Sequence, residues 1–118
     1  MSKVAIVILS DTEGGEALGR VVNALTAAKE YGEGGDTVKV VFTGAGTKWV
    51  NELASPDHKL HELFASLKRQ IEGACGYCAG AFGVSAEVES CGVRLLEDYG
   101  SNMSFRKLTS QGFQILTF

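Results

Sequence analysis

The sequence predicts an α/β fold: a single domain over residues 1–118, with about five mostly parallel strands and helices on both faces of the sheet. Short apolar segments rich in Val and Ile alternate along the chain with segments whose apolar residues recur every three or four positions. Strands that alternate with helices through short connections form largely parallel sheets. With 118 residues, 45% of them hydrophobic, the chain is long enough for one core and too short for two ordinary domains.

The first half of the chain contains a strand–helix–strand unit. Val4–Leu9 is an apolar run typical of a strand that is covered on both faces. Gly32 is expected just after the end of the following helix. The buried face of that helix is predicted from Ala17, Leu18, Val21, Val22, Leu25 and Ala28. Thr37–Phe42 is the second predicted strand, followed by a glycine-rich loop and a short helix that carries Trp49, Val50 and Leu53.

The second half adds three strands. Ser55, Pro56 and Asp57 predict a helix start, because Ser caps helices, Pro fits the first position and an acid suits the first turn. The buried face of this helix is predicted from Leu60, Leu63, Phe64 and Leu67. The elements expected after it are a strand over Ile71–Cys75, a helix from near Gly80 or Val84 to Cys91, a strand over Val93–Leu96, a short helix over Ser104–Ser110 and a last strand over Phe113–Phe118.

Composition and charge exclude several classes of function. Eleven Lys and Arg against fourteen Asp and Glu give a net charge of −3, and no basic run is present. We therefore expect neither nucleic acid nor an anionic membrane surface as a partner. The longest apolar run, Val4–Leu9, is far shorter than the roughly 20 residues that span a bilayer. We expect a cytoplasmic protein whose three cysteines are free thiols.

The strongest candidate site is a C-x-x-C motif, Cys75 and Cys78, at the predicted junction of a strand and a helix. Backbone N–H groups at a helix start are unpaired and favour negative charge, so a thiol placed there is shifted toward the thiolate. We predict that Cys75 and Cys78 are catalytic. Three glycines are expected to let the backbone approach a bound anion or a sulfur adduct closely, namely Gly76, Gly80 and Gly83. Tyr77 is expected to contact whatever approaches the thiols.

Other interpretations of the cysteines stay open. Free cysteine is among the most buried residue types, so Cys75 and Cys78 could be small core residues, as we expect for Cys91. A zinc site needs four ligands, and only Cys91, His58 and His61 remain to complete one, without metal-binding spacing. We therefore predict no metal and no cofactor. The two histidines are expected on a solvated or half-buried face, and a general base for Cys75 is the alternative.

Two loops are expected at the same sheet edge as the cysteines. Ser10, Asp11 and Thr12 follow the first strand, where hydroxyls and amides could cradle a phosphate. This loop lacks a Walker lysine, and a capped turn is the simpler interpretation. Thr43 and Gly44 open a second loop with a lone G-x-G, which is most often a tight turn. If either loop is functional, we expect it to shape the pocket around Cys75.

The chain resembles the DsrE/DsrF-like family of small sulfur-relay proteins. The resemblance rests on the C-G-Y-C motif followed by Gly83-Val84, on Cys91-Gly92-Val93 and on the terminal segment Gly112–Phe118. It implies a three-layer sandwich of the flavodoxin or Rossmann type, assembly into homo-oligomers or related subunits, often trimers or hexamers, and a persulfide on the cysteine that matches Cys75. Cys78 is additional, and Phe82 stands where such proteins commonly carry Arg.

Three functional hypotheses follow. The first is a cytoplasmic sulfurtransferase or persulfide carrier, in which Cys75 accepts sulfane sulfur from a donor and passes it to an acceptor protein. The second is a dithiol redox protein in which Cys75 attacks and Cys78 resolves the adduct into a disulfide. The third is a non-catalytic oligomeric module that binds a small ligand.

Overall fold

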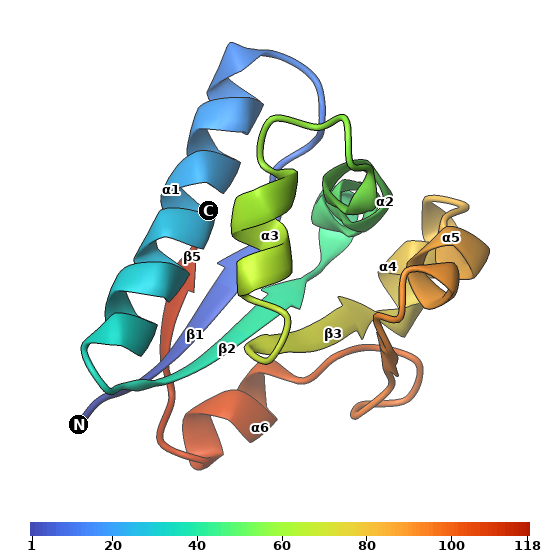
Figure 1. Ribbon diagram of the computed structural model, residues 1–118. Helices are drawn as coiled ribbons and strands as arrows, with labels where there is room; N and C mark the ends of the chain where they lie inside the picture. The colour runs from blue at the N-terminus through green and yellow to red at the C-terminus, as the bar shows by residue number, and fades with distance from the viewer.

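The computed structural model describes residues 1–118 and contains a five-stranded parallel sheet with helices on both faces, as Figure 1 shows. The strands are β1 (Lys3–Ile8), β2 (Thr37–Phe42), β3 (Ile71–Cys75), β4 (Leu95–Leu96) and β5 (Gln114–Thr117). Their order across the sheet is β4-β3-β2-β1-β5, and every pairing is parallel. The predicted α/β class and the parallel sheet are confirmed.

The helices divide unequally between the two faces. They are α1 (Gly15–Glu33), the 3-10 helix η1 (Gly44–Lys48), α2 (Trp49–Ala54), α3 (His61–Ser66), α4 (Gly76–Ala81), α5 (Ser85–Ser90) and α6 (Phe105–Ser110). Helices α1, α2 and α3 contribute to a hydrophobic cluster of 20 buried residues on one face. On the other face, α6 and its flanking segments enclose a cluster of 8 (Figure 1). No helix has both the length and the apolar character needed to cross a bilayer.

The alternation of side chains along the strands determines the side on which Cys75 lies. Ala74 belongs to the larger cluster, and Cys75, the next residue and the last of β3, belongs to the smaller one. Successive residues of a strand point to opposite faces, so the two must separate in this way. The Cys75 thiol therefore lies on the α6 side of the sheet, at the carboxyl end of β3, where ligands of open α/β sheets bind.

The predicted helix start at Pro56 is wrong. Residues 56–60 form consecutive turns, and α3 begins at His61. The His58 backbone N–H donates to the Ser55 carbonyl, which closes the first turn. The His58 ring then accepts the Leu60 N–H at 3.0 Å and packs edge-on against Trp49, with the ring centroids 6.0 Å apart. This side-chain hydrogen bond replaces the backbone pairing that would continue a helix.

Several predicted bounds also differ from the structure. Gly32 lies inside α1, which ends at Glu33, and the left-handed turn after it falls at Gly35 with φ 86°. The helix expected from near Gly80 or Val84 to Cys91 is present as α5, with Val84 and Cys91 as its caps. A separate short helix, α4, precedes it, and Gly83 adopts φ 70° between the two. The first strand begins and ends one residue earlier than predicted, and β4 and β5 are shorter than their predicted segments. The short helix before β5 is present, with Ser104 as its cap.

We expect Gly46→Ala to destabilise the fold strongly. A Cβ at Gly46 would lie 2.0 Å from the carbonyl oxygen of Ile8, the last residue of β1, and backbone atoms cannot move aside cheaply. The expected loss is at least about 2 kcal/mol in the free energy of unfolding, measured by urea denaturation. Gly19→Ala is the matched control. A Cβ at Gly19 meets nothing within 4 Å and Gly19 lies inside α1, so this variant is expected to gain about 0.5–1 kcal/mol. Equal effects of the two substitutions would contradict the predicted contact.

Candidate functional site

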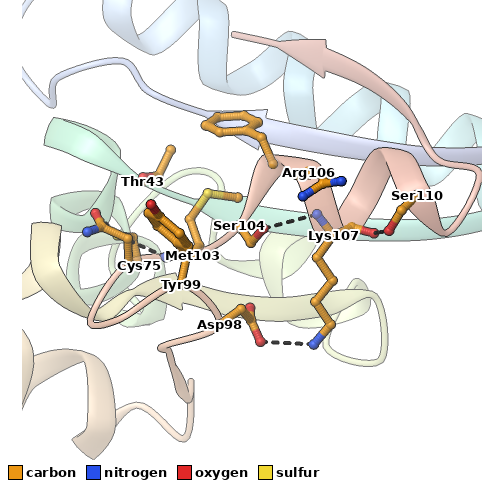
Figure 2. Close-up of a pocket in the computed structure, with 11 residues that line it drawn as sticks. Thr43, Cys75, Asp98, Tyr99, Met103, Ser104, Arg106, Lys107 and Ser110 are labelled. Atoms are coloured by element: carbon orange, nitrogen blue, oxygen red, sulfur yellow. Dashed lines mark hydrogen bonds and ion pairs between the residues drawn. The ribbon is translucent and has the colours of Figure 1, made fainter.

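Cys75 lies in the wall of a cavity of about 970 Å³ at the carboxyl edge of the sheet. Thr43, after β2, contributes a second part of the wall, and the segment after β4 contributes Asp98, Tyr99, Asn102 and Met103. The start and outer face of α6 complete the cavity (Figure 2). Cys75 itself is only 1% exposed, so a reagent reaches its sulfur through this cavity.

The backbone around Cys75 favours the ionised form of its thiol. The Met103 N–H donates to the Cys75 sulfur at 3.4 Å, and the thiol donates to the side-chain oxygen of Asn102 at 3.7 Å. Burial alone would raise the pKa of Cys75. The N–H groups of Cys78 and Met103, helped by the Cys78 thiol and the Thr43 hydroxyl, outweigh burial and hold this pKa below the ordinary value of a cysteine.

The amide of Met103 is positioned by a tight turn in the segment 97–104. Tyr99 and Asn102 exchange two backbone hydrogen bonds, each 2.9 Å long. The Tyr77 N–H, in the first turn of α4, donates to the Ser101 carbonyl at 2.6 Å. A Cβ on Gly76 would lie 3.0 Å from that same carbonyl, so glycine allows α4 and the turn to approach. We predicted Gly76 as a residue that approaches a ligand, and in the structure it approaches the Ser101 turn.

Cys78 lies one turn along α4 from Cys75 and packs against the smaller hydrophobic cluster. Its sulfur is 3.6 Å from the hydroxyl oxygen of Thr43, and its side chain is one of the groups that lower the pKa of Cys75. The structure therefore brings Cys75, Cys78 and Thr43 together, as predicted. Both cysteines are free thiols.

The first predicted loop does not line this cavity. Ser10 and Asp11 accept the indole N–H of Trp49 through their backbone carbonyls, at 3.0 and 3.1 Å. The Asp11 carboxylate pairs with Lys48 at 2.6 Å and accepts the backbone N–H of Thr12. Its pKa is lowered, first by the Lys48 hydrogen bond and then by the Thr12 amide. Residues 10–12 are therefore held against Trp49 and Lys48, and Asp11 is occupied by Lys48 and the Thr12 amide.

The remaining predicted site residues do not line the cavity. Gly44 adopts φ 57° at the start of η1 and packs near Leu9. Gly80 faces the Ser85 hydroxyl, and Gly83 makes the left-handed turn between α4 and α5. Tyr77 is largely exposed on α4.

The two histidines and Cys91 lie away from Cys75. His61 contacts the Leu53 carbonyl through its ring, and neither His61 nor His58 lines the Cys75 cavity. Cys91 is partly buried against the larger hydrophobic cluster, close to the predicted core position. No group of three or more His, Cys, Asp or Glu side chains is arranged to hold a metal ion.

The segment between β4 and α6 contributes to the site although no motif in the sequence marks it. Asn102 and Met103 contact the Cys75 sulfur directly, and Asp98, Arg106 and Lys107 line the same cavity. A usable signal was present, because the loop after the predicted strand Val93–Leu96 must open at the same sheet edge as the loop after Ile71–Cys75.

Residues 2–118 match the DsrE/DsrF-like family, nearly the whole chain. The chain belongs to this family. It is 29% identical, over 96 residues, to an uncharacterized protein of Methanocaldococcus jannaschii, and the alignment covers 81% of this chain and 78% of the relative. Its fold is similar to that of a conserved protein of unknown function from Bacteroides thetaiotaomicron, with a TM-score of 0.62 at 17% identity over 97% of this chain and 94% of the other. Membership suggests sulfur relay at the level of the family.

We expect Asn102→Asp to raise the pKa of Cys75. The substitution keeps the shape of the side chain and places a carboxylate at the position that is 3.7 Å from the sulfur, where a like charge disfavours the thiolate. The pKa is measured from the pH dependence of iodoacetamide alkylation, assigned to Cys75 by fragment-ion mass spectrometry. Asn51→Asp, which adds the same charge on an exposed position of α2, is expected to leave the profile unchanged. An unchanged profile for Asn102→Asp would contradict the proximity.

Proposed function

We propose that the protein carries sulfane sulfur as a persulfide on Cys75. The observation that supports this proposal most directly is the Cys75 thiol itself, whose pKa is lowered by two backbone N–H groups in the wall of a large cavity. A nucleophilic sulfur must be a thiolate and must be reachable by a donor. The lowered pKa increases the fraction of thiolate, and the cavity gives access to the sulfur. Membership of the DsrE/DsrF-like family agrees with this chemistry.

The loading step is balanced without an oxidant or reductant. The Cys75 thiolate attacks the outer sulfur of a donor persulfide, a new S–S bond forms on Cys75, and the donor leaves as a thiolate. In the unloading step an acceptor thiolate attacks the outer sulfur of the Cys75 persulfide. The S–S bond on Cys75 breaks, and Cys75 leaves as a thiolate while the acceptor becomes the persulfide.

The N–H donors at Cys75 assist both steps. In loading, the Met103 and Cys78 amides increase the fraction of thiolate. In unloading, Cys75 is the leaving group, and a thiol of lower pKa leaves faster. The same two amides therefore favour the arrival and the departure of sulfur, which is the behaviour that a carrier requires.

A dithiol function is the second candidate, and the position of Cys78 favours it. Both the backbone N–H and the side chain of Cys78 contribute to the lowered pKa of Cys75, and both cysteines are free thiols. In its thiolate form, Cys78 could attack the Cys75 sulfur of a persulfide, form a Cys75–Cys78 disulfide and release hydrosulfide. The protein would then act as a redox protein or would discharge its own sulfur.

Intact-protein mass spectrometry after exposure to a small persulfide donor tests the proposal. We expect the wild-type chain to gain one sulfur atom and Cys75→Ser to gain none, because serine lacks the attacking thiolate. Cys91→Ser is the matched control, since Cys91 lies outside the Cys75 cavity, and it should load as the wild type does. Loading that survives in Cys75→Ser would overturn the proposal.

The same experiment on Cys78→Ser separates the two candidates. If Cys78 only supports the Cys75 thiolate, the variant loads more slowly and keeps its sulfur. A wild type that loses two hydrogens without retaining sulfur, while Cys78→Ser retains it, would establish the dithiol function instead.

We also propose that the protein forms a homo-oligomer. Four aromatic side chains are exposed, namely Tyr77, Phe82, Tyr99 and Phe105, and Tyr99 is 77% exposed. Exposed large apolar side chains commonly contribute to an interface between chains. Light scattering at micromolar concentration is expected to give the mass of three or more chains, and a monomer mass would refute the proposal.

A further inference from the structure

The charge of the cavity differs in sign from the charge of the chain. The chain as a whole carries a net charge of −3. The cavity that contains Cys75 is lined by two cations, Arg106 and Lys107, and by one anion, Asp98. Figure 2 shows that both cations come from α6, across the cavity from Cys75. One positive charge is therefore in excess in the wall of the cavity that contains the thiol.

The excess charge belongs to Arg106. Lys107 pairs with Asp98 at 2.9 Å, so these two charges largely cancel. Two other arginines are occupied as well, because Arg20 pairs with Glu16 and Arg94 with Glu72. Arg106 has no ion-pair partner and makes no side-chain hydrogen bond, although it borders the cavity that leads to Cys75. Its guanidinium is free to receive an anion from a bound molecule.

We propose that this cavity selects small sulfur donors and acceptors that carry a carboxylate, and that Arg106 pairs with that carboxylate while the sulfur meets Cys75. A planar guanidinium binds a carboxylate through two parallel hydrogen bonds, which orients the molecule as well as attracting it. The volume of about 970 Å³ is in the range of small-molecule sites. Low-molecular-weight thiols built from an amino acid or a short peptide have this combination of sulfur and carboxylate.

The Ser104 hydroxyl supplies a second polar group on the same wall. Its oxygen accepts the Lys107 backbone N–H at 3.0 Å, which leaves the hydroxyl proton available to a ligand (Figure 2). Arg106 and Ser104 are thus positioning residues, whereas Cys75 is the residue that reacts. The transfer of sulfur to and from such molecules rests on the proposed function, but the preference for an anion does not.

Two pairs of probes test the preference. The first pair is the persulfide of N-acetylcysteine and the persulfide of its methyl ester, which differ in one negative charge. The second pair is iodoacetate and iodoacetamide, which alkylate thiolates and differ in the same way without any sulfur transfer. For each pair, the ratio of the rates at Cys75 (charged over neutral) is measured in the wild type, in Arg106→Gln and in Arg69→Gln.

We expect Arg106→Gln to lower both ratios by roughly fivefold, the effect of one exposed charge–charge contact. The neutral probes should react at nearly the wild-type rate. Arg69→Gln is the matched control, because Arg69 is also exposed and unpaired but lies before β3, at the opposite edge of the sheet. It should leave both ratios unchanged.

The remaining outcomes are distinguishable. Equal ratios in the wild type and in Arg106→Gln, or an equal fall in Arg69→Gln, would overturn the anion preference. If neither persulfide loads Cys75 but the iodoacetate ratio still falls in Arg106→Gln, the sulfur-carrier function fails and the preference for an anion is supported.

Discussion

The hydrogen bond from the Tyr77 N–H to the Ser101 carbonyl, 2.6 Å long, joins the first turn of α4 to the turn that follows β4. The approach is possible because Gly76 has no side chain to separate the two backbones. Once the turn is held there, the Met103 amide faces the Cys75 sulfur. This backbone contact fixes the turn that carries one of the amides that lower the pKa of Cys75, and the same segment leads along the cavity wall into α6.

The unequal covering of the sheet explains why the cavity lies where it does. The face under α1, α2 and α3 is filled by the larger hydrophobic cluster. The opposite face is covered mainly by α6, a helix of only six residues, and by the segments beside it. A short helix cannot cover a five-stranded sheet to its edge, so space remains beside the last residue of β3. Strand alternation places Cys75, and not Ala74, on that side.

Much of the fold could be predicted from the sequence, because buried strands such as Thr37–Phe42 and the long helix have strong periodic patterns. The helix start at Pro56 could not, since the outcome depends on the His58 ring, which takes a backbone N–H and packs on Trp49. The C-x-x-C motif located Cys75 and Cys78. The contribution of Met103 remained hidden because a backbone amide has no signature in sequence. The Asn102 side chain and Arg106 approach the site only through the three-dimensional course of the segment after β4.

Most residues that line the cavity lie in one continuous segment of the chain, and most residues of the hydrophobic core lie outside it. Residues 97–111 provide most of the cavity wall but only two of the buried side chains, Met103 and Leu108. Cys75 and the larger cluster lie outside this segment. The segment could therefore be exchanged between members of the DsrE/DsrF-like family as a cassette, provided that an amide still faces the sulfur and Gly76 still meets its turn. Such chimaeras would keep Cys75 and its strand and would differ in the charge of the cavity wall.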